Sequence, residues 1–310
     1  MVESYRAFPG GSPGSAWEPR TDGSFFGHFN SYLYQLVSDL PSLLLAMRAV
    51  LQEFQQDGVG YFELRTTPRR IGDHTEEDTV RAICDVISSW NESEPMRTNL
   101  ILSIDQAKHT ADQAIHIANM ASHLRDEGLP VVGVDLCGDP HRTKDMTIFR
   151  PAFALAKAAG LSVTLHFAEV PHSSTEDVLR EMLSWKPDRL GHVVHVPKPM
   201  RQEIIDRQIS VELCLTCNVL AGMLPDKAGF ERHHFREWWE GGGRVSLGTD
   251  DVGVFGSMPS EEYLLAARHF ALSRKELIRL SREALKGAFG DTARTMEMLA
   301  EFEEATEEST

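Results

Sequence analysis

Short, continuous apolar runs alternate along the chain with longer blocks that have helical spacing. Because each run is apolar at nearly every position, it is typical of a strand covered on both faces, as in a parallel sheet. The alternation of runs and blocks predicts repeated strand–helix units. The runs predicted as strands are Val59–Leu64, Leu100–Ile104, Val131–Leu136, Leu161–Leu165, Arg189–His192, Ile209–Leu213 and Val245–Leu247. The blocks predicted as helices are Asp78–Trp90, Ala111–Glu127, Phe149–Ala159, Thr175–Trp185 and Lys198–Gln208, after two earlier helices split near Pro41.

Two architectures of the α/β class fit this alternation: a doubly wound open sheet and a (β/α)8 TIM-type barrel. Nearly every predicted strand ends in a polar or ionisable residue, and the active sites of parallel α/β folds collect at these ends. An open sheet would concentrate its chemistry at one switch point, so chemistry at every strand end favours the barrel. We predict seven strands where a closed barrel of this type has eight, so the barrel is expected to lack its first strand.

The place of that first strand is taken by a segment of unusual composition. Residues 10–23 read GGSPGSAWEPRTDG, which is rich in Gly, Pro and Ser, so residues 1–23 are predicted to form an unstructured N-terminal arm. The barrel domain is expected to cover residues 24–300, with no break that would indicate a second domain. The acidic residues 301–310 are predicted to be a helix that frays into a charged tail.

The net charge of the chain limits the kinds of molecule that it can bind. The 310 residues include 31 Lys and Arg against 46 Asp and Glu, a formal net charge of −15. Nucleic-acid binding needs a basic face, so we expect none, although a small anion in a locally basic pocket stays compatible with this charge. Four cysteines are too few for a disulfide framework and suit a reducing compartment. With neither a signal-peptide pattern nor an apolar stretch of spanning length, we expect a soluble, monomeric, cytoplasmic protein that binds no membrane.

The ends of three predicted strands carry the sharpest candidate chemistry. His166 ends one strand and Glu169 follows in the turn, His192 ends the next, and Asp250 and Asp251 follow the last. Imidazole and carboxylate are suitable ligands for a divalent transition metal, and a nearby carboxylate can act as acid or base. The structural alternative is a buried histidine bonded to a backbone carbonyl, with the acidic residues capping helices.

A second histidine pair has a different environment. His233 and His234 lie in a segment rich in Glu and Arg with helical character, so they are predicted to be solvated.

Six motifs at the strand ends follow one another in a definite order. They are Tyr61-Phe-Glu-Leu-Arg-Thr-Thr-Pro68, Gly133-Val-Asp-Leu-Cys-Gly-Asp139, His166-Phe-Ala-Glu169, Arg189-Leu-Gly-His192, Glu212-Leu-Cys-Leu-Thr-Cys-Asn218 and Thr249-Asp-Asp251. In this order and spacing, over residues 25–290, they resemble the adenosine deaminase family. The first and third motifs look most like its adenosine deaminase-like branch, whose members remove the N6 substituent from N6-methyl-AMP and related nucleotides.

The resemblance implies a (β/α)8 barrel with one zinc ion and hydrolytic deamination at purine C6. His166 and Asp250 would be zinc ligands, and the zinc would make water a stronger nucleophile by lowering its pKa. Glu169 would protonate ring N1, and His192 would orient and stabilise the attacking hydroxide.

The resemblance also implies a binding site for a small purine nucleotide or nucleoside. Asp251 would hold purine N7, and Gly138 would offer its backbone N–H to N3. The groups expected near the ribose and the 5′-phosphate are Asp105, Thr66, Thr67 and Arg69, with Arg69 as the natural anion partner. A plain adenosine deaminase would have no need of Arg69 for a phosphate.

One part of the family pattern is missing. The family's first strand carries a His-x-His pair that supplies two more zinc ligands, and none of the 13 histidines here lies two residues from another. The chain therefore offers two of four expected protein ligands, and His28, the one histidine of the N-terminal region, falls in a helical pattern. Three interpretations follow: an incomplete product of an enzyme gene, an inactive homologue that binds purine nucleotides or acts in interactions, or a site completed by an unforeseen ligand.

Overall fold

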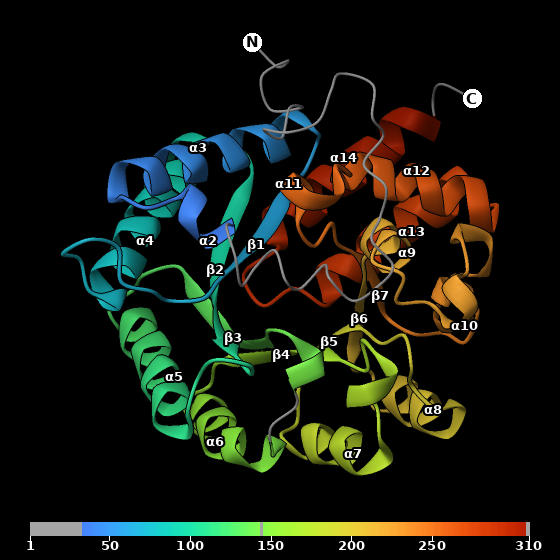
Figure 1. The fold of residues 1–310 in the computed structure, drawn as a ribbon. Helices are drawn as coiled ribbons and strands as arrows, with labels where there is room; N and C mark the ends of the chain where they lie inside the picture. Colours follow the sequence, from blue (N-terminus) through green and yellow to red (C-terminus); the bar gives the residue numbers. More distant parts are fainter. Residues whose placement is uncertain (1–32, 143–144, 308–310) are drawn as a thin grey trace, which may run out of the picture.

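A single parallel sheet curls through the centre of the molecule, and helices cover its outer face (Figure 1). The computed structural model describes residues 33–142 and 145–307. The strands are β1 (Tyr61–Thr66), β2 (Arg97–Asp105), β3 (Val131–Cys137), β4 (Ser162–Phe167), β5 (Arg189–His192), β6 (Ser210–Leu213) and β7 (Val245–Leu247). All seven predicted strands are confirmed. They lie side by side in sequence order, every pair parallel, which makes a curled half-barrel consistent with a TIM-type barrel that lacks one strand.

Several expectations for the N-terminus lie outside the described residues. These are the unstructured arm over residues 1–23, the place of the missing strand and the environment of His28.

Helices connect the strands as the sequence pattern predicts. The helices before and between the strands are α2 (Leu33–Leu36), α3 (Leu40–Gln56), α4 (Glu76–Ser93), α5 (Ala111–Asp126), α6 (Arg150–Ala158), α7 (Glu176–Ser184), α8 (Lys198–Asp206), α9 (Leu215–Leu220) and α10 (Phe235–Glu240). Short 3₁₀ turns lie at Pro140–Arg142, Met146–Phe149, Pro171–Ser173, Pro225–Lys227 and Phe230–Arg232. The split near Pro41 is confirmed, because this proline sits in the first turn of α3, where its missing N–H costs no helical bond.

Hydrogen-bonding side chains set the helix starts. Thr75 and Asp78 form a reciprocal capping box at the start of α4, and Thr110 and Gln113 do the same for α5. Each box satisfies two backbone N–H groups that the first turn of a helix leaves without partners. These caps explain why the helices begin within a few residues of the predicted positions.

The hydrophobic core lies between the sheet and the surrounding helices. Leu102, Val134 and Val163, from three neighbouring strands, are fully buried in it. Phe153 of α6 stacks on Trp185 at the end of α7, with 4.8 Å between ring centroids. Continuous apolar strands are therefore covered as their composition predicts.

Four helices follow the last strand. They are α11 (Val252–Phe255), α12 (Pro259–Phe270), α13 (Arg274–Lys286) and α14 (Ala293–Glu307). Because α14 runs to Glu307, most of the segment predicted as a fraying acidic tail continues a regular helix. None of the described helices combines the length and the apolar character needed to cross a bilayer.

Two ion pairs cross the interior of the half-barrel, one of them buried and the other partly buried. Arg189 Nη1 of β5 lies 2.7 Å from Glu63 Oε2 of β1, and Arg65 Nη2 of β1 lies 2.7 Å from Glu212 Oε2 of β6. Glu63 also accepts hydrogen bonds from the Tyr61 hydroxyl at 2.6 Å and from the backbone N–H of Phe289 at 2.5 Å. These contacts join the first strand to the fifth and sixth strands and to the segment before α14.

Candidate active site and metal centre

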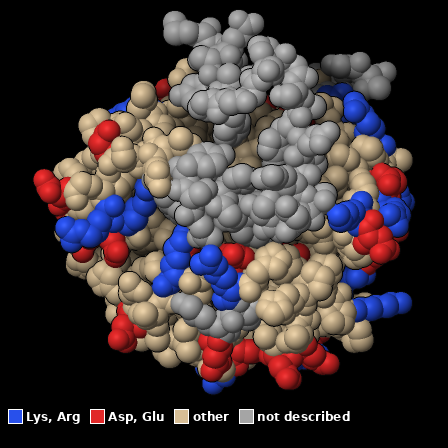
Figure 2. Space-filling view, viewed as in Figure 1, with Lys and Arg blue, Asp and Glu red and all other residues tan. Residues whose placement is uncertain are grey.

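The carboxyl ends of the strands open into one large cavity of about 1500 Å³. Its walls include most of the site residues predicted from the sequence and apolar side chains of α3 and of the C-terminal helices. On the face seen in Figure 2, basic and acidic side chains are interspersed over the surface that is not grey. The cavity can therefore hold an organic ligand the size of a nucleotide.

His166 projects into this cavity from the end of β4. Its Nδ1 lies 2.8 Å from the carbonyl oxygen of Leu136 and 3.2 Å from Asp135 Oδ1. A proton on Nδ1 serves these acceptors, so Nε2 is left to bind a metal ion, as in metal sites whose outer partners fix the imidazole. Burial lowers the pKa of His166, but the Asp135 carboxylate outweighs it and raises that pKa to about 10, so a proton and a metal ion compete for Nε2.

Asp250 approaches His166 from the segment after β7. Its backbone has a φ of 54°, a left-handed conformation that costs free energy in a residue other than glycine and is typical of functional sites. The Cys217 thiol donates a hydrogen bond to Asp250 Oδ2 at 2.9 Å, and burial raises the pKa of that thiol well above its usual value. A neutral thiol is thus kept as a donor that orients the carboxylate.

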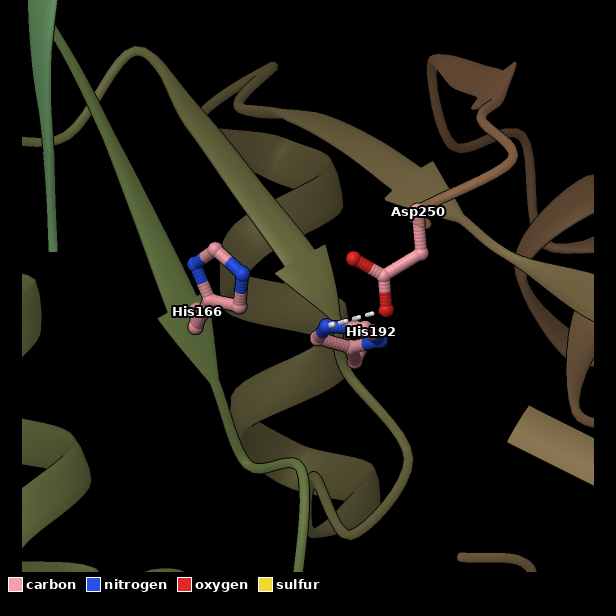
Figure 3. A group of neighbouring side chains, drawn as sticks. All are labelled: His166, His192 and Asp250. Atoms are coloured by element: carbon pink, nitrogen blue, oxygen red, sulfur yellow. Dashed lines mark ion pairs between the residues drawn. The ribbon is translucent and has the colours of Figure 1, made fainter. Parts of the chain in front are cut away.

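His166, Asp250 and His192 form one cluster that could hold a metal ion (Figure 3). One candidate ligand atom from each side chain lies within 4.8 Å of the other two. Imidazole nitrogens and a carboxylate oxygen are a suitable donor set for zinc and similar divalent metals. Sequence reasoning assigned His166 and Asp250 to the metal and His192 to catalysis, and the structure brings all three together.

His192 ends β5 with a φ of 63° and is 2% exposed. Its Nε2 faces the cluster, 3.7 Å from Glu169 Oε1 and 4.0 Å from Asp250 Oδ2. Its Nδ1 lies 3.0 Å from the side-chain nitrogen of Asn218 on the other side of the ring. One edge of the imidazole therefore faces Glu169 and Asp250, and the other is held by α9.

Glu169 follows β4 and is buried, with 4% of its surface exposed. Burial raises the pKa of its carboxyl, and the opposing influence of His192 and then His166 does not cancel this rise. A carboxyl group in such surroundings keeps a proton more readily than a solvated one, which suits a general acid.

Asp251 and Gly138 line the same cavity. Burial, and then the neighbouring Asp250 carboxylate, raise the pKa of Asp251 to about 8. Gly138 has a φ of +100°, and a Cβ atom there would come 2.2 Å from Asp105 Oδ1. Only glycine therefore lets the backbone approach Asp105 this closely at the cavity wall.

The residues predicted to bind the ribose and phosphate also line the cavity. Asp105 is buried and its Oδ1 accepts hydrogen bonds from the N–H groups of Ala107 and Lys108 at 2.9 and 3.2 Å. The guanidinium of Arg69 donates to the carbonyl oxygen of Val37 at 2.9 Å. The remaining two, Thr66 and Thr67, lie at the end of β1.

A family model described as adenosine deaminase matches residues 20–305. The chain belongs to the adenosine deaminase family. The resemblance read from the motifs, the TIM-type barrel and the assignment to hydrolytic deaminases are thereby confirmed.

Several members of the family are similar over most of their length. The N6-methyl-AMP deaminase of Danio rerio is 33% identical over 268 residues, which cover 83% of this chain and 75% of that protein. The corresponding Homo sapiens deaminase is 31% identical over 281 residues, with coverages of 86% and 76%. A crystal structure of Arabidopsis ADAL complexed with IMP matches with a TM-score of 0.82 at 30% identity, over 92% of this chain and 83% of that one.

The prediction that His233 and His234 are solvated is wrong. They are 2% and 8% exposed, and their rings stack with 4.2 Å between centroids. His234 Nε2 lies 2.6 Å from the backbone oxygen of His192, so it donates to a residue of the cluster whose φ is positive. The surrounding Glu and Arg residues point outward, which hid the inward-facing histidines from a reading of composition.

The four cysteines are free thiols. The reducing compartment expected from their number stays a prediction. The cytoplasmic location and the monomeric state stay predictions.

Proposed function

We propose that this member of the adenosine deaminase family hydrolyses N6-methyl-AMP at purine C6 to IMP and methylamine. The observation that carries the proposal is the convergence of His166, Glu169, His192 and Asp250 at the ends of β4, β5 and β7. The names of the similar deaminases and the IMP held by an ADAL structure support a nucleotide monophosphate as the ligand.

We propose a single zinc ion at the cluster, held by Nε2 of His166 and the carboxylate of Asp250. The donor set fits zinc, although it has fewer protein ligands than the three of an ordinary catalytic zinc site, and the sequence contains no His-x-His pair. Zinc would supply a Lewis acid that makes water a stronger nucleophile near neutral pH.

The chain's own residues would position the purine and move the proton. Glu169 would hold the proton at purine N1, so that negative charge does not build up on the ring as C6 becomes tetrahedral. His192 would orient the attacking water, and Asp251 and the backbone N–H of Gly138 would hold N7 and N3. The ribose and 5′-phosphate would lie against Asp105, Thr66, Thr67 and Arg69.

The test is zinc content of the purified chain together with turnover of N6-methyl-AMP and adenosine in the presence of added zinc. Release of IMP from N6-methyl-AMP is the expected result. Nucleotide binding without turnover at any zinc concentration would instead support the inactive, purine-binding homologue.

A substrate series tests the role of Arg69. We expect Arg69→Gln to lower kcat/KM for N6-methyl-AMP about 10- to 100-fold, because a charge-assisted hydrogen bond contributes about 1.5–3 kcal/mol. Turnover of the nucleoside without the 5′-phosphate should change little. The matched control is Arg70→Gln, since Arg70 is exposed and does not line the cavity. Equal losses for nucleotide and nucleoside, or a preference of the wild-type chain for the nucleoside, would rule out this phosphate contact.

A further inference from the structure

A chain of four hydrogen-bonded groups runs from the start of α10 to the edge of the His192 ring that faces away from the cluster. The backbone N–H of Phe235 donates to His233 Nδ1 at 3.0 Å. His233 Nε2 lies 3.2 Å from Asn218 Oδ1, and Asn218 Nδ2 lies 3.0 Å from His192 Nδ1. The polar residues of this chain are buried, with 2% of His233 and none of Asn218 exposed, so no solvent completes their bonds.

The direction of every bond follows from the first one. A backbone N–H can only donate, so His233 Nδ1 is an acceptor and the ring proton sits on Nε2. Nε2–H then donates to the amide oxygen of Asn218, and the amide N–H donates to His192 Nδ1. A neutral imidazole has one acceptor nitrogen and one N–H, so His192 carries its proton on Nε2.

Met223 supports this orientation of the amide independently. Its sulfur atom lies 3.4 Å from Asn218 Nδ2 and can only accept. The same side-chain nitrogen therefore has an acceptor on each side, His192 Nδ1 and Met223 Sδ. A flipped amide would place the side-chain oxygen of Asn218 against the Met223 sulfur, which has no proton to donate.

His233 stays neutral in this environment, as the chain of bonds requires. Burial lowers the pKa of His233 well below its usual value, and the neighbouring His234 and His192 lower it further. Its ring is also fixed by the stack on His234.

The orientation changes what His192 can do at the cluster. An imidazole with a proton on Nε2 presents no lone pair there, so it cannot ligate the metal that His166 and Asp250 would hold. It presents an N–H, which can donate to the oxygen of an attacking water or hydroxide.

We propose that His233 and Asn218 are positioning residues that hold His192 in its Nε2–H tautomer, as a hydrogen-bond donor and not a metal ligand. The role of this donor in turnover rests on the proposed deaminase function, whereas the tautomer itself does not.

The tautomer is read directly by NMR on the full-length, metal-free chain labelled with ¹⁵N-histidine. Protonated and unprotonated ring nitrogens have well separated ¹⁵N shifts, and the His192 signals are identified by their loss in His192→Gln. We expect Nε2 protonated and Nδ1 unprotonated in the wild-type chain. A proton on Nδ1 of His192 would overturn the inference whatever the activity of the chain.

Asn218→Asp reverses the direction of the hydrogen bond between residue 218 and His192 Nδ1. A carboxylate only accepts, so both histidines must turn an N–H toward it and His192 Nε2 becomes a free lone pair. We expect kcat to fall about 100-fold or more with little change in KM, while zinc affinity rises because the cluster gains a ligand. Unchanged kcat and unchanged zinc affinity would contradict the proposal.

His233 is tested by a pair of variants. His233→Phe removes the donor to Asn218 and is expected to lower kcat about 10- to 100-fold and to mix the His192 tautomers. His233→Gln keeps an N–H near the same place and should restore most of the activity and the single tautomer. The control is His269→Gln, because His269 stacks on Phe230 beside this segment and is outside the chain of bonds. Equal losses in all three variants would show that only the packing of the segment matters.

The two proposals fail in different ways. An Nε2–H tautomer in a chain without turnover would leave the positioning role of His233 and Asn218 standing and remove the deaminase proposal. Turnover by a chain in which His192 carries its proton on Nδ1 would support the deaminase proposal and rule out the positioning role of His233 and Asn218.

Discussion

Glu169→Gln is expected to lower kcat for N6-methyl-AMP about 10²- to 10⁴-fold, the range that a general acid or base contributes. A glutamine side chain keeps the volume and one carbonyl oxygen of glutamate but has no acidic proton for purine N1. The free energy of unfolding should stay the same or rise slightly, because the substitution removes a buried carboxyl whose pKa burial already raises. The measurements are steady-state kinetics and urea unfolding of the same preparation.

Glu176→Gln is the matched control for Glu169→Gln. Glu176 lies in the first turn of α7 on the same connection, and its side chain is 74% exposed. It should leave both kcat and stability unchanged. If Glu169→Gln keeps more than about a tenth of the wild-type turnover, a smaller loss than general acid–base catalysis supplies, another group protonates the purine.

Glu63→Ala is expected to destabilise the chain by about 3 kcal/mol, because it leaves the buried charge of Arg189 with only a longer ion pair, of 3.5 Å, to Glu212. The side chains of Glu63 and Arg189 are 6% and 7% exposed, and their ion pair is 2.7 Å long. The same substitution also removes the acceptor of Tyr61 and of the backbone N–H of Phe289. The urea concentration at the unfolding midpoint, measured with an unchanged m value, gives the loss.

Two further variants show whether the loss of stability in Glu63→Ala comes from the burial of the Arg189 charge. Glu127→Ala breaks an ion pair with Arg81 whose side chains are 39% and 35% exposed, and should cost less than about 1 kcal/mol. The double variant Glu63→Ala/Arg189→Met should recover much of the loss, since replacing both buried charges by apolar groups is often neutral. A loss from Glu63→Ala no larger than that from Glu127→Ala would mean that Glu212 or water compensates the charge of Arg189.

The strands and the connecting helices could be predicted because one local signal determines each. A run such as Val131–Leu136 is apolar on both faces, and only a strand covered on both sides hides it. The polar residues after the strands, including His166 and Asp250, then meet at one edge because parallel strands end together. The resemblance of the motifs to a known family then supplied the expected roles of individual residues.

The pairing of side chains across the interior could not be predicted. Glu63 and Arg189 are 126 positions apart, and only the curvature of the sheet brings them to 2.7 Å. The burial of His233 depends in the same way on the fold of the segment between β6 and β7. Such contacts depend on tertiary packing, which hydropathy along the chain does not record.

Because the sheet is an open arc, the two interior ion pairs constrain its curvature. In a closed ring any two strands are joined by two routes, but within residues 33–307 the hydrogen-bonded ladder provides one, from β1 to β7 in sequence order. The ion pairs Arg189–Glu63 and Arg65–Glu212 cross the open side of this arc. They connect β1 directly to β5 and to β6. His166 and His192 lie on β4 and β5, within the part of the sheet that these ion pairs span, so we expect the pairs to hold these strands at a fixed curvature that the ladder alone would leave free to open.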